Sequence, residues 1–238
     1  MFAFVASEAR EFSGLLRHVE GLKTLDWGID FARAGILNGR AIVIAANGPG
    51  PRLAGQAADA IEEHYELEGL ASIGFCGALN PSLQPCEIVV AGTIVVADTI
   101  VGEAGVAHAL SVPRSHSCER QTAVLLSLDR VATTPQEKSG LRARSGADAI
   151  EMEAAALAGR ARKWQIPFYA IKVVTDTASE SFPLDFNRLR TPEGRFSIPK
   201  IIAAVLLRPA AIPALINLNR RCSQAAKILG DFLADASF

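Results

Sequence analysis

The sequence lacks the features that mark several common protein classes. It has no excess of one charge, since 24 basic and 25 acidic residues give a formal net charge of -1. A chain without a basic run has no field to hold a polyanion, so nucleic acid is not expected as a partner. No P-loop or nucleophile elbow occurs, and the third glycine that would complete a dinucleotide fingerprint after Gly48 and Gly50 is displaced. A dinucleotide-dependent dehydrogenase is therefore disfavoured.

Cysteine motifs and long apolar runs are also missing. The four cysteines, Cys76, Cys86, Cys118 and Cys222, have neither C-x-x-C spacing nor a nearby histidine pattern, so we expect reduced thiols and no metal site. The most apolar stretch, IPKIIAAVLLRPAAIPALINL, is interrupted by basic residues and prolines, so a transmembrane helix is not expected. The N-terminus has no basic region ahead of an apolar one, and we expect a cytoplasmic protein.

The sequence does contain short Val- and Ile-rich runs that alternate with longer helical patterns. This alternation predicts an α/β fold, in which strands that are apolar on both faces lie in the middle of a sheet. No repeat or linker marks a domain boundary in these 238 residues, so one domain is the default. Strands are predicted at 2–6, 40–46, 70–77, 87–98, 131–134 and 167–175, and helices at 8–20, 50–65, 122–126, 134–144, 152–164, 197–207 and 212–233.

Several acidic residues stand where predicted strands end, which is where α/β sheets collect ligands. Asp176 ends one strand, although an Asp that caps the following turn is an equally ordinary interpretation. Glu151 and Glu153 precede a helix, whose positive end favours negative charge. They lie about 200° apart on a helical wheel, so at most one should face the apolar side. Lys172 interrupts an apolar strand, and we expect a carboxylate partner for it, such as Glu151 or Asp176.

A glycine-rich turn, AANGPGPRLAGQ at residues 45–56, lies between a predicted strand and a predicted helix. The backbone N–H groups of such a turn can bind an anion at the helix N-terminus, and Arg52 adds a positive charge. Pro49 and Pro51, however, remove two of the donors. The alternative is a tight turn with an exposed arginine.

Three segments, taken in order, resemble the signature motifs of the purine nucleoside phosphorylase and methylthioadenosine/S-adenosylhomocysteine nucleosidase superfamily. They are GFCGALNPSLQPCEIVVA, AIEMEAAALA and AIKVVTDTASE, and with the N-terminal strand and AREFSGLL the likeness covers roughly residues 2 to 180. This chain departs from the family motifs at five positions. Phe75 stands where the family often has Ser or Thr, and Cys76 where it has Ala. Cys86 and Glu87 replace Gly and Asp, and Lys172 replaces Arg.

The resemblance implies a three-layer α/β/α sandwich with a mixed central sheet and a homo-oligomer, expected to be a dimer. We expect one domain over 1–238, with an apolar helical extension from about residue 197. The tail and the segment DRVATTPQEKSGLRARSGADAIEMEA resemble the hopanoid-associated phosphorylases. That likeness implies phosphorolysis of an adenine nucleoside with a hydrophobic 5' substituent, such as an adenosyl-hopane. The apolar tail suits a greasy substrate, contact with a membrane surface, or an ordinary dimer interface.

The resemblance also implies roles at the reacting centre. Cleavage of an N-ribosidic bond places positive charge on the ribose and negative charge on the leaving base. Glu153 would accept hydrogen bonds from a ribose hydroxyl, with Met152 as a soft apolar surface against the sugar. Asp176 would protonate or hydrogen-bond N7 of the purine, which requires a raised pKa. The remaining substrate-binding residues implied are Glu151, Phe75, Cys76, Gly77 and Val131.

The attacking group stays open between two alternatives. In the hydrolases a glutamate near the N-terminus activates water, and Glu11 or Glu8 matches that place. In the phosphorylases a glycine-rich turn binds phosphate, and Asn47, Gly48 and Arg52 match that site. The resemblance favours inorganic phosphate as co-substrate and implies no cofactor. The alternative to an enzyme is a non-catalytic nucleoside-binding protein of the same fold. The presence of Glu11, Glu153 and Asp176 together favours an enzyme.

Overall fold

The computed structural model describes residues 1–96, 108–109 and 121–238, so Cys118 lies outside the described residues. The strands are β1 (Phe2–Ala6), β2 (Glu20–Thr24), β3 (Phe31–Leu37), β4 (Arg40–Ala46), β5 (Gly69–Ala78), β6 (Ile88–Val96), β7 (His108–Ala109), β8 (Gln121–Ser127), β9 (Ala149–Glu151) and β10 (Phe168–Asp176). The α-helices are α1 (Pro51–Glu62), α2 (Pro135–Ser145), α3 (Ala154–Trp164), α4 (Ile198–Leu207) and α5 (Ile212–Asp235), and the short 3-10 helices are η1 (Ala9–Phe12), η2 (Leu15–Arg17) and η3 (Pro209–Ala211).

The strands pair into one mixed sheet in the order β10-β6-β8-β9-β5-β1-β4-β3-β2, with β7 on β6. β1 runs parallel to β4 and β5, whereas β3 is antiparallel to β4 and β9 is antiparallel to β5. An additional pairing of β10 with β5 joins β5, β10, β6, β8 and β9 into a closed ring. The ends of β5, β9 and β10 therefore meet at one place.

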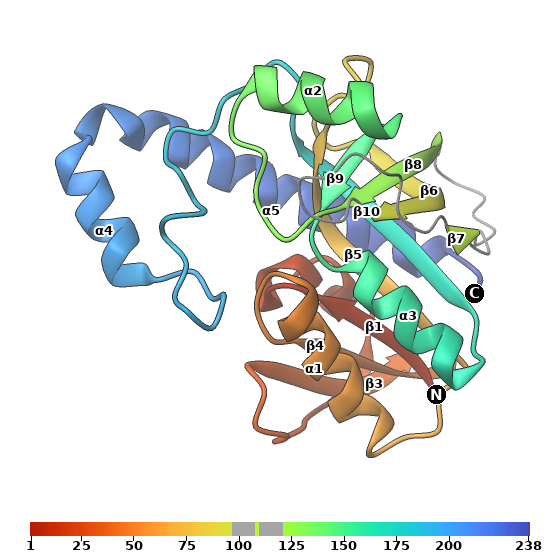
Figure 1. Cartoon of the computed structure of the whole chain (residues 1–238). Helices are drawn as coiled ribbons and strands as arrows, with labels where there is room; N and C mark the ends of the chain where they lie inside the picture. The colour runs from red at the N-terminus through yellow and green to blue at the C-terminus, as the bar shows by residue number, and fades with distance from the viewer. Residues whose placement is uncertain (97–107, 110–120) are drawn as a thin grey trace.

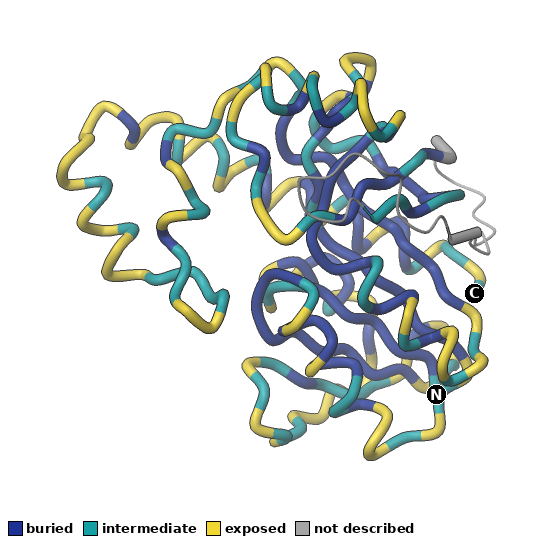
Figure 2. The backbone as a smooth tube through the Cα atoms, viewed as in Figure 1, coloured by how far each residue is buried: buried dark blue, intermediate teal, exposed yellow. Residues whose placement is uncertain are grey.

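Helices cover both faces of this sheet, as Figures 1 and 2 show. On one face α1 and α3 pack small side chains such as Ala57 and Ala161 against the sheet. On the other face α5 packs Leu229 and Phe232 against the sheet and η1. The predicted three-layer α/β/α sandwich with a mixed sheet is confirmed.

Most of the predicted core elements are present, but some were assigned wrongly. Residues 131–134, predicted as a strand, form a loop whose last residue, Thr134, caps α2 by accepting a hydrogen bond from Glu137 N–H. Residues 122–126, predicted as a helix, belong to strand β8, because a five-residue apolar run has no decisive periodicity. Residues 8–20 hold two short 3-10 helices rather than one helix, and β2, β3, β7 and β9 were not predicted.

The C-terminal arm, which we define as residues 197–221, comprises α4, η3 and the first part of α5. Figure 1 shows α4 and the start of α5 projecting away from the sheet. A small apolar cluster that includes Leu184, Leu189 and Ala211 holds the arm together. Within the described ranges no single helix is long and apolar enough to cross a bilayer; Ile198–Leu207 and Pro209–Asp235 reach that length and hydropathy only jointly, across a bend of 108°.

Candidate active site

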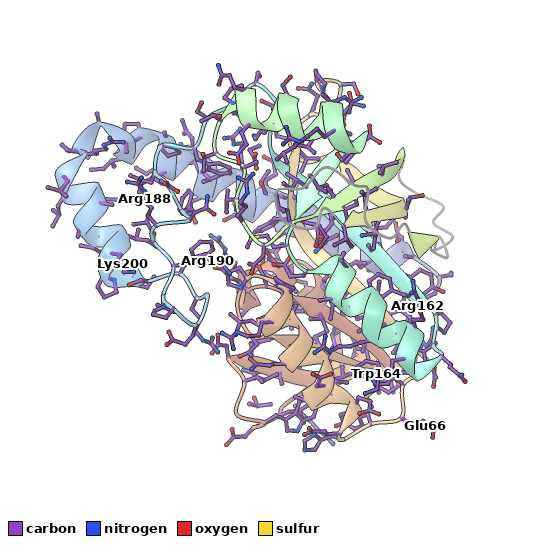
Figure 3. The ribbon with its side chains drawn as sticks, in the orientation of Figure 1. Glu66, Arg162, Trp164, Arg188, Arg190 and Lys200 are labelled. Carbon is purple, nitrogen blue, oxygen red and sulfur yellow. The ribbon has the colours of Figure 1, made fainter. Side chains whose placement is uncertain are left out.

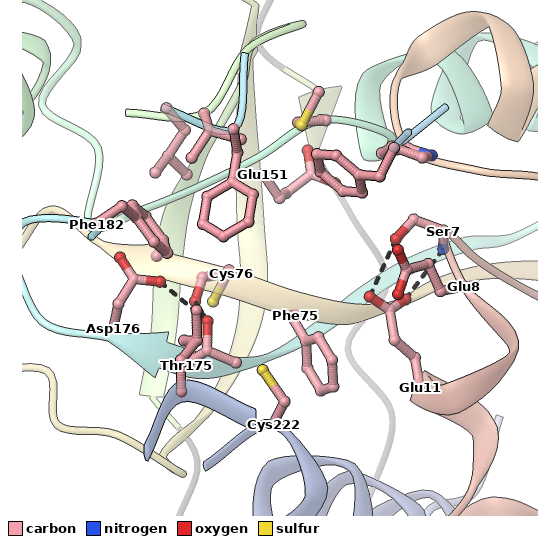
Figure 4. Close-up of a pocket in the computed structure, with 18 of the residues that line it drawn as sticks. Ser7, Glu8, Glu11, Phe75, Cys76, Glu151, Thr175, Asp176, Phe182 and Cys222 are labelled. Atoms are coloured by element: carbon pink, nitrogen blue, oxygen red, sulfur yellow. Dashed lines mark hydrogen bonds between the residues drawn. The ribbon is translucent and has the colours of Figure 1, made fainter. Parts of the chain in front are cut away.

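One cavity of about 490 Å³ lies where the ends of β5, β9 and β10 meet. Its volume falls in the range of small-molecule sites. Figure 4 shows Glu11, Phe75, Cys76, Glu151 and Asp176 around it. The sequence-predicted residues that line the cavity are Glu11, Phe75, Cys76, Gly77, Val131, Glu151, Met152, Glu153 and Asp176, and Glu8 lines it as well.

A bulge at the end of β10 places Asp176 in the cavity. The register against β5 shifts between Val174 and Asp176, so Asp176 pairs with Gly77. A bulge re-aims side chains, and here both Thr175 and Asp176 line the cavity although neighbours on a regular strand point to opposite faces. A methyl group at Gly77 would lie 2.9 Å from Asp176 Oδ2, so glycine leaves room for this carboxylate.

Asp176 is buried, and each of its carboxylate oxygens has one side-chain hydrogen-bond partner. Lys138 Nζ, from α2, lies 2.6 Å from Asp176 Oδ2, and Thr175 Oγ1 donates to Asp176 Oδ1 at 2.9 Å. Burial raises the pKa of Asp176, while the Lys138 ammonium acts in the opposite direction. Lys138 also donates to the carbonyl oxygens of Thr177 and Glu180. The sequence analysis did not find Lys138, because one lysine in a polar helix carries no signal of burial.

The expected partner of Lys172 is confirmed as Glu151. Lys172 Nζ lies 3.0 Å from Glu151 Oε2 and 3.7 Å from Glu153 Oε2, and donates to the carbonyl oxygen of Ile73. These carboxylates raise the pKa of Lys172 against the opposing effect of burial. The helical-wheel expectation for the two glutamates is wrong, because Glu151 ends β9 and Glu153 is the residue before α3, so both are buried.

The two glutamates differ in the acceptor capacity left for a ligand. Glu151 Oε2 accepts the N–H groups of Glu153 and Ala154, but its Oε1 is buried without a partner within the described chain. Glu153 Oε1 accepts the N–H of Gly50 at 2.9 Å. Burial raises the pKa of Glu153 to about 7, with Lys172 acting against it. A buried carboxylate oxygen without a donor is suited to accept a hydrogen bond from a ligand hydroxyl.

Glu11, in η1, presents a buried carboxylate from a third segment of the chain. The Ser7 N–H donates to Glu11 Oε2 at 3.0 Å, and Ser7 Oγ donates to Oε1 at 3.1 Å. Burial raises the pKa of Glu11 to about 6, and Lys172 acts against the rise. Gly74 has φ +121°, and a methyl group there would lie 2.3 Å from Glu11 Oε2. Glu8 is instead paired with Arg10 and is more exposed than Glu11.

The residues predicted to bind phosphate lie outside this cavity. Asn47 is buried and its amide is engaged by Gln56, Arg195 and the N–H of Asp30. Arg52 donates to the carbonyl oxygen of Glu193 and lines an adjacent cavity. Gly48 lines neither cavity. The glycine-rich turn contributes Pro49 to the cavity wall and the Gly50 N–H to Glu153, so its role is to position a carboxylate.

Apolar side chains from the C-terminal half of the chain form much of the remaining wall. Ile198, Ile201, Leu215 and Leu218 of the C-terminal arm line the cavity. Phe182, Phe186 and Phe196 from the preceding loops complete this wall. The described ranges contain no group of His, Cys, Asp and Glu residues that could hold a metal ion. The cavity thus combines buried carboxylates with a large apolar surface.

The fold and this arrangement define a nucleoside phosphorylase-like α/β/α protein. A methylthioadenosine/S-adenosylhomocysteine nucleosidase of Neisseria meningitidis, solved in complex with methylthio-immucillin-A, superposes with a TM-score of 0.74 at 19% identity, covering 98% of this chain and 96% of that one. Native futalosine hydrolase of Helicobacter pylori gives a TM-score of 0.72 at 16% identity, with 98% and 94% covered.

Sequence comparison agrees with the fold. The family model described as Phosphorylase superfamily matches residues 92–206. A 5'-methylthioadenosine/S-adenosylhomocysteine nucleosidase of Shewanella baltica is 25% identical over 207 residues, which cover 78% of this chain and 87% of the relative. The chain is therefore similar to the phosphorylase superfamily in sequence over residues 92–206 and to nucleosidases of known structure in fold.

Proposed function

We infer that this protein is an enzyme that cleaves the N-ribosidic bond of an adenine nucleoside whose 5' position carries an apolar substituent. The observation that carries this inference is that Glu11, Glu153 and Asp176, from three distant segments, line one cavity whose remaining wall is largely apolar. The relatives named as nucleosidases and futalosine hydrolase support the reaction class. The apolar wall supports a hydrophobic 5' substituent, of which an adenosyl-hopane is one example.

The carboxylates match the two charges that develop as the bond breaks. Glu153, and the free Oε1 of Glu151, would accept hydrogen bonds from the ribose hydroxyls and stabilise positive charge on the sugar. Asp176 would give a proton to N7 of the purine as the C1'–N9 electron pair moves to the base. The raised pKa of Asp176 favours the protonated form that this step requires.

Water is the attacking group that the cavity supports best. Glu11 would take a proton from water as its oxygen bonds to C1', and burial gives this carboxylate a pKa of about 6, near the value a general base needs. Phosphorolysis is the alternative implied by the resemblance to hopanoid-associated phosphorylases. It requires another anion site, because Asn47, Gly48 and Arg52 do not line the cavity. Arg10 and Arg130 do line it, but they are already paired with Glu8 and Glu137.

Adenine release measured with and without inorganic phosphate tests the reaction and its attacking group. We expect release without phosphate, and turnover that increases with the length of an apolar 5' substituent across a panel of adenosines. Release that needs phosphate would replace hydrolysis by phosphorolysis. Tight binding of every nucleoside without release would favour the non-catalytic nucleoside-binding protein.

The substitution Asp176→Asn tests the acid directly. Since general acid catalysis contributes about 10²- to 10⁴-fold, we expect turnover to fall within that range while thermal unfolding still shows a folded protein. Asp59→Asn, on α1 and outside the cavity, where it pairs with Arg160, is the matched control and should keep full activity. An unchanged rate for Asp176→Asn would remove this residue from the mechanism. Homodimer formation and a cytoplasmic location stay predictions from the sequence.

A further inference from the structure

The C-terminal arm exposes large apolar side chains on its outer face. Ile198, Ile202 and Leu206 follow one another at four-residue spacing along α4, so they form one stripe. Leu206 and Leu207 are 76% and 83% exposed, and Ile212 and Ile216 continue the apolar surface onto α5. Contiguous apolar surface of this kind is unusual in a protein that meets only water.

The charges within this segment of the sequence all have one sign, although Arg195 and Arg221 are paired with Asp30 and Glu180 of other segments. From Gly194 to Gly230 the sequence contains Arg195, Lys200, Arg208, Arg220, Arg221 and Lys227 but no Asp or Glu, although the whole chain has a net charge of -1. Arg208 and Arg220 are exposed, and no ion pair with a carboxylate is found for either within the described residues. Figure 3 shows the exposed Lys200 on α4, whereas Arg188 and Arg190 nearby are paired with Asp185 and Asp129. An apolar face with a basic border is complementary to an anionic lipid surface.

The same helices continue into the candidate active site. Along α4, Ile202 and Leu206 are exposed, Ile201 lines the cavity, and Ile198 is exposed and also lines the cavity. α5 contributes Leu215 and Leu218 to the cavity and Ile216 to the exposed surface. The outer apolar surface therefore adjoins the apolar wall of the cavity.

We propose that the C-terminal arm docks the protein onto anionic membranes, with the outer face of α4 and the start of α5 lying in the lipid interface. A second copy of the chain fits this surface less well, because a two-fold interface places the same patch against itself and would gather the positive charges of both copies, Arg208 and Arg220 included, in one interface. The arm lies on the membrane rather than crossing it, because the later part of α5 packs Ala225, Leu229 and Phe232 into the core. This inference goes beyond the proposed reaction and does not depend on it.

Flotation of the purified full chain with vesicles tests the proposal without any substrate. We expect binding to vesicles of phosphatidylcholine mixed with phosphatidylglycerol, weaker binding to phosphatidylcholine alone, and release as salt is raised. No binding to the anionic vesicles would overturn the proposal, even if the protein cleaves nucleosides. Binding without catalysis would leave the proposal standing and remove the proposed function, so the two failures are distinguishable.

Two variants test the apolar and the basic contributions separately. Leu206→Ser with Leu207→Ser, and Arg208→Glu with Arg220→Glu, should each weaken vesicle binding at least about tenfold. Both variants should keep the wild-type thermal unfolding, since all four side chains are exposed. The matched controls are Leu22→Ser and Lys23→Glu on β2, which are exposed on another part of the molecule and should bind vesicles as the wild type does.

Light scattering on the same variants distinguishes the competing occupant of the surface. A second copy of the chain would be indicated if the wild type is a dimer in solution and Leu206→Ser with Leu207→Ser makes it a monomer without changing vesicle binding. That result would overturn membrane docking. An unchanged mass together with lost vesicle binding would support it.

Discussion

At the scale of single residues, the protonation of Asp176 is under two opposed influences. Burial raises the pKa of this carboxyl, whereas Lys138, 2.6 Å away and fully buried, lowers it. If Asp176 is the acid that protonates the base, activity falls as pH rises through its pKa. Lys138→Met removes the lowering influence, so we expect the alkaline limb of the pH–rate profile to move to higher pH.

The same substitution should also cost stability, because a buried ion pair that loses one partner leaves an unpaired charge. The expected loss in the free energy of unfolding is roughly 3 kcal/mol, measurable with urea. Lys163→Met, on the exposed side of α3, is the control and should change neither quantity. An alkaline limb that stays in place or moves to lower pH would show that Lys138 does not tune the acid.

Lys172 and Lys138 also show how far the sequence predicts buried ion pairs. Lys172 interrupts an apolar strand, and a buried charge needs a partner, so a carboxylate such as Glu151 was predictable. Lys138 lies in a helix with many polar residues, where the sequence predicts a solvated side chain. Its burial arises from how α2 lies over the end of β10, which is a tertiary effect that local pattern does not contain.

At the scale of secondary-structure elements, the end of β5 is shaped to admit Glu11. Gly74 adopts φ +121°, and a methyl group there would lie 2.3 Å from Glu11 Oε2. Gly74→Ala must therefore distort the strand and displace the carboxylate. We expect a loss of more than about 1 kcal/mol in the free energy of unfolding, together with a large fall in nucleoside cleavage.

Gly159 on α3 provides the matched control. It is exposed, and a methyl group added there meets no atom within 4 Å. Gly159→Ala should therefore stabilise the protein by about 0.5–1 kcal/mol and leave activity unchanged. Equal effects of the two substitutions on stability or on activity would contradict the role given to Gly74.

Some strands are predictable from the local sequence pattern, whereas others depend on pairing with distant segments. The long apolar runs of β1, β4, β5 and β10 were predicted because each is buried on both faces. β9 is three residues long and exists because Ala149 and Ile150 pair with β5 and β8. Pairing with distant segments forms β9 and places Glu151 at its end. A helical wheel therefore does not describe Glu151 and Glu153.

At the scale of the whole molecule, the candidate site should lower stability at neutral pH. Glu11 and Glu153 have pKa values raised by burial to about 6 and about 7, from 4.5 for the free side chain. Between pH 4.5 and 7 the folded chain therefore holds protons that the unfolded chain has lost. Stability falls as pH rises wherever the folded state binds more protons. The stabilisation that comes from these two protons is fully present below pH 4.5, the pKa in the unfolded chain. It is lost as pH rises through about 6 and about 7, the pKa values in the folded chain.

Urea unfolding at pH 5 and pH 8 tests this prediction, with a difference of the order of 1 kcal/mol expected from Glu11 alone. Glu11→Gln cannot ionise, so its free energy of unfolding should change less between the two pH values than that of the wild type. The exposed Glu62→Gln on α1 should follow the wild-type dependence. We expect Glu11→Gln to abolish activity and to flatten the pH dependence of stability. Both results together would show that ionised Glu11, the form needed to activate water, destabilises the fold. A pH dependence that Glu11→Gln leaves unchanged would show that Glu11 ionises as readily in the folded chain as in the unfolded one.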